Sequence, residues 1–284
     1  MYKARFTNSK GRTFLFGYEN GNIFDISGLT GHEVDIAFSQ GFNQIGETAE
    51  NLSVKSRDFE ITGRLLGEAA QSKKNMLSVF APMENGRLFF EDKYYIDCVV
   101  KYSPIITVET RDPRFELVLS APYPYWQNVK TESFVLGGYD PDFFFPKTYR
   151  NDELYYFGRA RLEGNTNIFN SGEVDVFFKL EIESASITKN PIITNVGTGE
   201  FLKLNATVNA GEKYSIYQSV GGLFVDKETN GAVEDAFAVL DEDSNLFTLH
   251  AGDNVFEISA ESGKDGLIVS ATFSSAVVGV YEGM

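Results

Sequence analysis

The stretch LSAPYPYWQ, residues 119–127, divides the chain into two parts with different patterns of strands and turns. Its two prolines lack a backbone N–H, so a strand cannot continue through them in the middle of a sheet. Its aromatic side chains offer large apolar surfaces that can anchor the stretch to a domain. The stretch predicts a stiff domain junction, made of Pro122, Tyr123, Pro124, Tyr125 and Trp126. Stacking on a sugar is the alternative role for Trp126, which is the only tryptophan.

The composition favours strands and turns over helix bundles. The 284 residues include 25 Phe, 14 Tyr and 26 Gly, and 43% of the chain is hydrophobic. Aromatic residues are enriched in strands, and this hydrophobic share is enough to bury a core. We therefore expect a mainly β protein with two domains.

The charge and the single cysteine limit the classes of function. The net charge is −15 and basic residues do not cluster, which argues against sequence-specific nucleic-acid binding. Cys98 can form no internal disulfide and lies in an alternating apolar stretch, which predicts a buried core thiol. No signal peptide and no apolar run of about 20 residues is present, so we expect a soluble protein made in the cytoplasm with no membrane partner.

Residues 1–130 predict a β-barrel-like domain with one helix. The pattern of EAAQSKKNMLSVFA predicts that helix over residues 68–81, before Pro82. Ile36 and Phe38 alternate at period two, and a polar, glycine-bearing loop follows over residues 41–56. Loops of this length are often functional, so we expect a flexible loop or a partner-binding arm here.

Residues 131–284 predict a second domain, with residues 131–150 as a connector. From residue 151 onward, short apolar stretches of β-forming residues recur about every ten residues between Gly, Asn and Asp clusters. That spacing predicts a β-sandwich or jelly roll.

The patterns typical of catalytic or metal sites are weak. His32 and His250 have no metal-ligand neighbour at a useful spacing. The segment DEDSN, residues 241–245, begins like a calcium loop, but Leu246 stands where that loop requires glycine. Glu181 and Glu183 have a spacing near that of glycosidase carboxylates, yet any strand with a polar face shows the same pattern. We therefore predict a non-enzymatic protein with no catalytic, cofactor or metal site.

The order of several segments resembles the distal tail proteins of siphophages that infect Gram-positive bacteria. In the first half they are FEITGRLLG at 59–67, the predicted helix, and RLFFEDKYYIDCVVKYSP at 87–104. APYPYW follows at the junction. The second half contributes NSG at 170–172, KNPIITNVGTGEFLKL at 189–204 and FTLHAGDNVFEI at 247–258.

The resemblance implies a structural role in the virion, at the phage or prophage tail tip. Such proteins are similar to a hub, in which a homo-hexameric ring of N-terminal domains joins the tail tube protein to a tail-tip protein. A galectin-like C-terminal domain can carry receptor-binding proteins for host attachment. The loop at 41–56 would match the arm that such proteins use in ring contacts, with Ile36, Phe38 and Phe42 as interface residues. A negatively charged lumen would not bind the phage DNA that passes through it.

Two other functions are consistent with the sequence. A carbohydrate-binding module at the tail tip would require exposed Trp or Tyr on the C-terminal sandwich. A tail-associated hydrolase would require a pair of carboxylates in a cleft. The sequence-based conclusion is the non-enzymatic hub, with carbohydrate recognition as the alternative.

Overall fold

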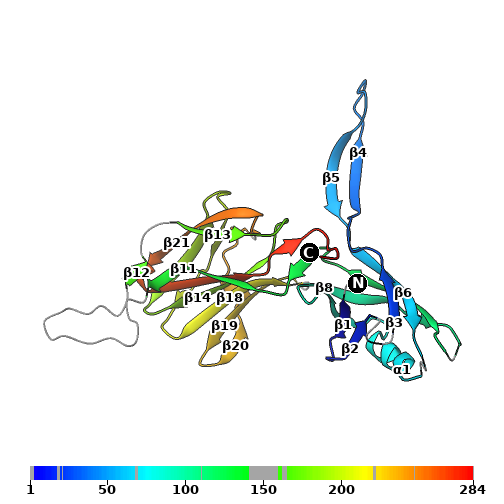
Figure 1. The fold of residues 1–284 in the computed structure, drawn as a ribbon. Coiled ribbons are helices and arrows are strands. Elements are labelled where there is room, and N and C mark those ends of the chain that lie inside the picture. The colour runs from blue at the N-terminus through cyan, green and yellow to red at the C-terminus, as the bar shows by residue number, and fades with distance from the viewer. Residues whose placement is uncertain are drawn as a thin grey trace. The chain divides into compact units, whose positions relative to one another are not determined.

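The computed structural model describes residues 3–17, 20, 22–67, 70–109, 111–140, 159–161, 165–219, 222–245 and 247–283. The chain forms two compact units (Figure 1). The first unit comprises Met1–Lys130 together with Ala276–Met284, and the second is Thr131–Ser275. Strands are the main regular elements of both units, which confirms the mainly β class.

A nine-stranded sheet and one helix form the body of the first unit. Seven strands follow the order β2-β1-β7-β8-β9-β6-β3, and β10 pairs with both β8 and β23. The elements are β1 (Ala4–Asn8), β2 (Thr13–Phe16), β3 (Asn22–Ile26), β6 (Arg57–Leu65), α1 (Ala70–Val79), β7 (Asn85–Phe90), β8 (Tyr94–Ile106), β9 (Arg114–Ala121), β10 (Trp126–Asn128) and β23 (Ala276–Val277).

Helix α1 closes the core of this unit. It spans Ala70–Val79 and ends three residues before Pro82; residues 68 and 69 of the predicted helix lie outside the described part of the chain. Met76 and Val79 are fully buried, and the ring of Phe80 stacks on Phe6 with centroids 4.8 Å apart. Cys98 is buried in the same core as predicted, and burial raises the pKa of its thiol. The helix therefore contributes an apolar face to this core.

Two strands of the first unit stand apart from the nine-stranded sheet. β4 (Val34–Ser39) and β5 (Thr48–Val54) pair only with each other and project as a hairpin (Figure 1). We call residues 33–55 the arm. The prediction of a loop over residues 41–56 is wrong, because nearly half of this range forms strand β5 and the turn is confined to the tip of the hairpin. Both faces of the hairpin are exposed, so its strands do not alternate between buried apolar and exposed polar residues. The sequence pattern therefore did not reveal the second strand.

The second unit contains two antiparallel sheets, of seven and five strands. The seven-stranded sheet has the order β12-β11-β22-β14-β18-β19-β20, and the five-stranded sheet contains β13, β21, β15, β16 and β17. The elements are β11 (Glu132–Asp140), β12 (Arg159–Arg161), β13 (Thr166–Asn170), β14 (Phe178–Ser184), β15 (Thr188–Asn195), β16 (Phe201–Lys203), β17 (Thr207–Val208), β18 (Glu212–Ser219), β19 (Gly222–Thr229), β20 (Ala232–Asp235), η2 (Phe237–Val239), β21 (Gly252–Ser262), η3 (Lys264–Gly266) and β22 (Leu267–Phe273).

The two sheets of the second unit share one apolar core, as in a sandwich. Buried Leu180 and Val269 come from the larger sheet, and buried Ile193 and Phe256 come from the smaller one. The rings of Phe178 and Phe256 meet between the sheets, 6.1 Å apart. Alternation along each strand therefore buries one face and leaves the other to solvent.

The structure differs from the sequence-based domain division at two places. Residues 132–140 of the expected connector form β11, which pairs with β22; residues 141–150 lie outside the described part. The last residues, Ala276–Met284, join the first unit instead of the second, because β23 pairs with β10. A strand of two residues is too short to show periodicity, so its partner cannot be predicted from sequence.

Candidate assembly interface

The arm has one apolar face. Val34 pairs with Val54 and Ile36 with Leu52, and residues opposite each other in an antiparallel pair share a face. Phe38 follows at period two and pairs with Ala49 after a bulge. Exposed fractions on this face include 41% for Ile36, 56% for Phe38 and 68% for Leu52. The arm therefore presents a continuous apolar surface to solvent.

The opposite face of the arm is polar and carries ion pairs and hydrogen bonds. Lys55 Nζ lies 2.7 Å from Glu33 and 3.8 Å from Asp35. Ser39 donates a hydrogen bond of 2.5 Å to Glu50. The contacts of Lys55 with Glu33 and Asp35, the Glu33 hydrogen bond first, raise the pKa of Lys55. A two-stranded ribbon with one polar face and one exposed apolar face is suited to bind a partner through the apolar face.

Gln44 organises the tip of the arm. Its side chain accepts a hydrogen bond from the N–H of Gly41 (2.9 Å) and donates one to Thr48 Oγ1 (2.8 Å). Phe42 and Ile45 beside it are 99% and 102% exposed. The tip therefore extends the apolar surface with two fully exposed side chains on an ordered turn.

The predicted interface residues thus lie together on one structural element. Ile36 and Phe38 share the apolar face, and Phe42 lies at the tip. The sequence reasoning missed Leu52, Val54 and Ile45. The alternation of Leu52 and Val54 in NLSVK was visible, but the expected loop obscured it.

A buried arginine holds the base of the arm. Arg57 begins β6 directly after the arm and is only 5% exposed. Its guanidinium donates to the carbonyls of Leu29 (3.2 Å), Gly31 (3.0 Å) and Val278 (2.6 Å), and its Nη2 contacts Nε2 of His32. Burial lowers the pKa of Arg57 to about 10. The C-terminal segment therefore fixes both ends of the arm to the body of the unit.

His32 makes this base sensitive to pH. Burial lowers the pKa of His32 from 6.5 and the charge of Arg57 adds to this, while the bond to the Val278 carbonyl opposes it. The folded state then binds a proton at His32 more weakly than the unfolded state does. The contribution of neutral His32 to stability is therefore fully present at neutral pH and is lost as the pH falls below 6.5. The groups facing the ring are Arg57 and Tyr125, whose ring centroid lies 5.1 Å away.

We expect His32→Gln to flatten this pH dependence. The free energy of unfolding is measured by urea denaturation at about pH 7.5 and at about pH 5.5. Between these two pH values it should fall more for the wild type than for the variant. His250→Gln, a change at the other histidine, is the control and should keep the wild-type slope. Equal slopes for wild type and His32→Gln would show that His32 does not titrate against folding.

The predicted junction residues lie at the end of the first unit. Trp126 is fully buried, with its ring 5.4 Å from Phe59 and 6.1 Å from Phe90. A side chain in this position cannot stack on a sugar. Pro124 is also buried, whereas Pro122 is exposed and the rings of Tyr123 and Tyr125 meet each other at 5.4 Å.

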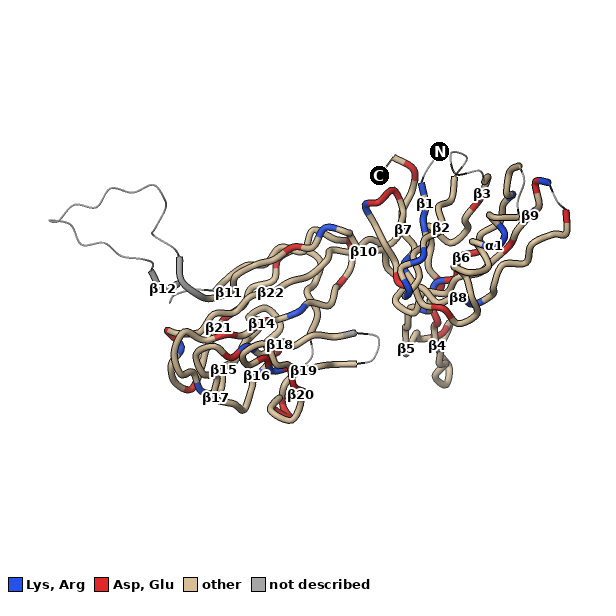
Figure 2. Tube along the Cα trace, turned by 90° about the horizontal axis from the view of Figure 1, so that it is seen from below, with Lys and Arg blue, Asp and Glu red and all other residues tan. Residues whose placement is uncertain are grey.

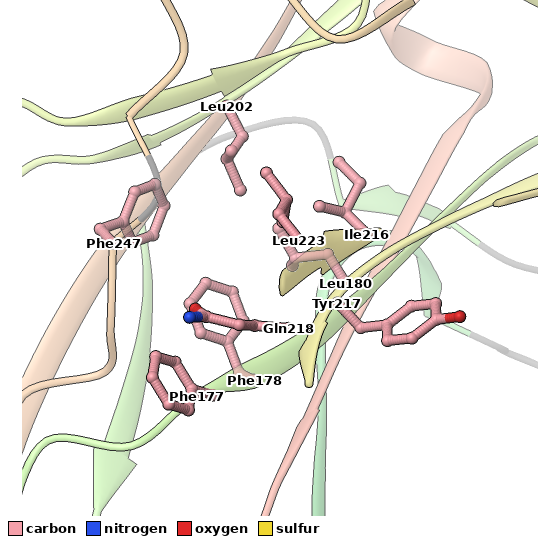
Figure 3. A pocket seen from close by; sticks show the side chains of 9 residues that line it. All are labelled: Phe177, Phe178, Leu180, Leu202, Ile216, Tyr217, Gln218, Leu223 and Phe247. Atoms are coloured by element: carbon pink, nitrogen blue, oxygen red, sulfur yellow. The ribbon is translucent and has the colours of Figure 1, made fainter. Parts of the chain in front are cut away.

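A small cavity in the second unit has an apolar lining (Figure 3). Three Phe side chains and four aliphatic ones surround the amide of Gln218, whose Oε1 has no hydrogen-bond partner among the described residues. The cavity holds about 10 Å³, which is the space of a single water. It is part of the core and too small for a sugar.

The weak chemical patterns of the sequence have structural roles. Asp241 accepts hydrogen bonds from Lys203 (2.7 Å) and Asn205 (3.0 Å), so DEDSN is a turn. Glu181 pairs with Lys179 at 2.7 Å on a strand. Within the described ranges, no group of three or more His, Cys, Asp or Glu could hold a metal, and no helix is long and apolar enough to cross a membrane.

Comparisons with known proteins identify the class to which this fold belongs. Residues 171–275 match the family described as "Siphovirus-type tail component, C-terminal domain". No curated protein sequence gives a significant match. Residues 171–275 are therefore similar to the C-terminal domain of siphovirus-type tail components, and the resemblance to distal tail proteins is confirmed.

Two solved structures share the fold over almost the whole chain. The Dit (gp 19.1) protein of phage SPP1, described as a paradigm of the hub adsorption apparatus in phages that infect Gram-positive bacteria, matches with a TM-score of 0.66 at 8% identity, over 95% of this chain and 98% of its own. A chain of the phage P2 baseplate matches with a TM-score of 0.52 at 13% identity, over 96% and 98%. At such identities the likeness shows the fold.

Proposed function

We propose that this protein is a structural hub of a phage tail tip, in which six copies form a ring. The arm is the observation that carries this proposal, because its exposed apolar face is suited to cover a neighbouring copy. The named roles of the similar structures, a hub and a baseplate, support the same function. The ring would join the tail tube to the tail-tip protein, without catalysis.

A ring requires two different surfaces on each copy. Heterologous contacts close into a ring when the rotation between neighbours divides a full turn. The arm supplies one of these surfaces. Lys, Arg, Asp and Glu are interspersed along both units (Figure 2), and the net charge of −15 would disfavour trapping of DNA in a lumen.

Disruption of the apolar face should convert a hexamer to a monomer. The variant Ile36→Ser, Phe38→Ser, Leu52→Ser removes most of the apolar side-chain surface of this face. Light scattering over a concentration series would measure the mass. Because all three side chains are at least 41% exposed, the fold itself should persist, which far-UV circular dichroism checks.

A matched control changes the polar face of the same hairpin. Asp35→Asn and Ser53→Ala lie opposite each other in the register and should leave the hexamer intact. A triple serine variant that stays hexameric would exclude the arm as the assembly element. A wild type that stays monomeric at every concentration would contradict self-assembly itself.

Carbohydrate recognition is a second candidate, favoured by an aromatic pair on the second unit. Tyr217 and Phe224 lie opposite each other in β18 and β19, with stacked rings 5.5 Å apart. The hydroxyl of Tyr217 donates to Asp226 at 2.9 Å, and this bond raises the pKa of Tyr217. Asp226 shares this face, so a carboxylate flanks the rings, whereas Ser215 opposite it is buried.

We expect Tyr217→Ala with Phe224→Ala to weaken any binding of host cell-wall polysaccharide about tenfold, since ring contacts contribute about 0.5–1.5 kcal/mol each. Calorimetric titration of the whole protein measures this. Phe237→Ala, which removes another exposed ring of the same unit, is the control. Wild-type protein that binds no polysaccharide would remove this second candidate.

A further inference from the structure

The side chain of His32 shares its contacts with the arginine that holds the base of the arm. Nε2 of His32 lies 2.8 Å from the carbonyl oxygen of Val278 and also contacts Nη2 of Arg57. Nη2 of Arg57 donates a hydrogen bond of 2.6 Å to that same carbonyl. An imidazole nitrogen, a guanidinium nitrogen and a carbonyl oxygen therefore all contact one another.

The contact between His32 and Arg57 depends on the protonation state of the imidazole. A neutral ring can present an unprotonated Nε2, which accepts a hydrogen bond from the guanidinium. A protonated ring carries an N–H on both nitrogens and a positive charge, so it accepts no hydrogen bond and repels Arg57. The geometry that is favourable with neutral His32 is thus unfavourable with charged His32, and one of the two side chains has to move.

Of these two side chains, His32 is the one that is free to move. Arg57 is 5% exposed and is also anchored by the carbonyls of Leu29 and Gly31. His32 is only partly buried, and Gly31 before it has a φ of +78° with no atom within 4 Å of the position of a Cβ. A glycine in open space changes its backbone angles at little steric cost. The backbone before His32 is therefore suited to act as a pivot.

A movement of His32 is carried directly into the arm. The arm begins at the next residue, Glu33, and its strands β4 and β5 pair only with each other. The two ends of the arm are joined, because the N–H of Lys55 donates to the carbonyl of Glu33 at 3.0 Å. The hairpin can therefore move as one piece, and its attachment to the body of the unit lies beside His32 and Arg57.

We propose that the contact among His32, Arg57 and the Val278 carbonyl is a proton-controlled clasp, which holds the arm while His32 is neutral and releases it when His32 is protonated. The clasp goes beyond the proposed hub, because it acts within one copy and requires no ring. Arg57 faces the imidazole from β6, Tyr125 faces it from the junction, and the C-terminal segment contributes the carbonyl.

The direction of proton linkage agrees with the clasp. Burial and the charge of Arg57 lower the pKa of His32 while the arm is held, and the bond to the Val278 carbonyl opposes them. A released side chain regains the ordinary pKa of 6.5, so the held state is favoured at neutral pH and is lost below 6.5. Between about pH 7.5 and about pH 5.5, the ratio of held to released arms should fall by up to about tenfold.

Distance measurements by electron paramagnetic resonance test the clasp in the whole chain. Spin labels are attached at Glu47→Cys, near the tip of the arm, and at Glu116→Cys on β9, and both native residues are exposed. The native Cys98 is buried and stays unlabelled. The triple serine variant of the arm provides the background, so that no neighbouring copy restricts the arm.

The expected result is one narrow distance distribution at about pH 7.5 and an additional broad one at about pH 5.5, from the released arms. His32→Gln should keep the narrow distribution at both pH values, because the glutamine amide can accept from Arg57 and donate to Val278 without titrating. His250→Gln is the matched control and should behave like the background. Far-UV circular dichroism at each pH checks that the strands remain folded.

Other results would overturn the clasp. A narrow distribution at both pH values would show that protonation of His32 does not release the arm. A broad distribution already at about pH 7.5 would show that the arm is never held. Equal broadening with and without His32→Gln would assign the release to another group. Light scattering tests the ring separately, so the clasp and the hub can fail independently of each other.

Discussion

Trp126→Ala is expected to lower the free energy of unfolding of the first unit by about 3–5 kcal/mol, as for other fully buried large side chains. Trp126 is completely buried and packs between Phe59 and Phe90. The surrounding sheet cannot collapse into the space, because β10 is held by β8 on one side and β23 on the other. Urea unfolding followed by far-UV circular dichroism measures the loss.

Trp126→Phe should cost less than half as much. The indole Nε1 is buried and has no hydrogen-bond partner among the described residues, so phenylalanine removes an unsatisfied donor while it keeps most of the apolar volume. Tyr102→Ala, at a position 60% exposed in the same unit, is the control and should change stability by less than about 0.5 kcal/mol. Equal losses for Ala and Phe would indicate that the N–H group, and not the packing, is what matters.

Termination of the chain after Ser275 is expected to destabilise the first unit by about 3–5 kcal/mol, in the upper range of single structural changes. The removed segment contains Ala276 and Val280, both fully buried, and burial of a valine contributes about 1.5–3 kcal/mol. It also removes the Val278 carbonyl, which accepts a 2.6 Å hydrogen bond from buried Arg57. Loss of a partner for a buried charge adds a comparable cost.

A second truncation controls for chain length. Termination after Val280 removes only exposed Tyr281 and the residues that follow, and should leave stability within about 0.5 kcal/mol of the wild type. Replacement of Thr131–Ser275 by a short Gly–Ser linker should retain a folded first unit, because Ala276–Val277 can still pair with β10. A truncation at Ser275 that leaves unfolding unchanged would show that the tail is dispensable.

Local patterns fixed the elements that are buried on one side. The alternation in RFELVLSA and in KLEIES appears in the structure as strands with one buried face. The spacing of Met76 and Phe80 identified α1. Burial of one face imposes a period on the sequence, so these elements can be read without knowledge of their partners.

The candidate interface was only half visible in the sequence. Ile36, Phe38 and Phe42 carried an apolar signal, but the register that adds Leu52 and Val54 to the same face depends on strand pairing. Pairing is a non-local property, since a strand pattern indicates a face and not a neighbour.

The sequence by itself determined a mainly β protein with one helix, a buried thiol at Cys98 and aromatic packing at residues 122–126. Only the tertiary structure decided that Trp126 belongs to a core and that Ala276–Met284 returns to the first unit. Composition and periodicity predict which residues are buried. The choice of partner across a long separation in sequence depends on contacts that exist only once the sheet is formed.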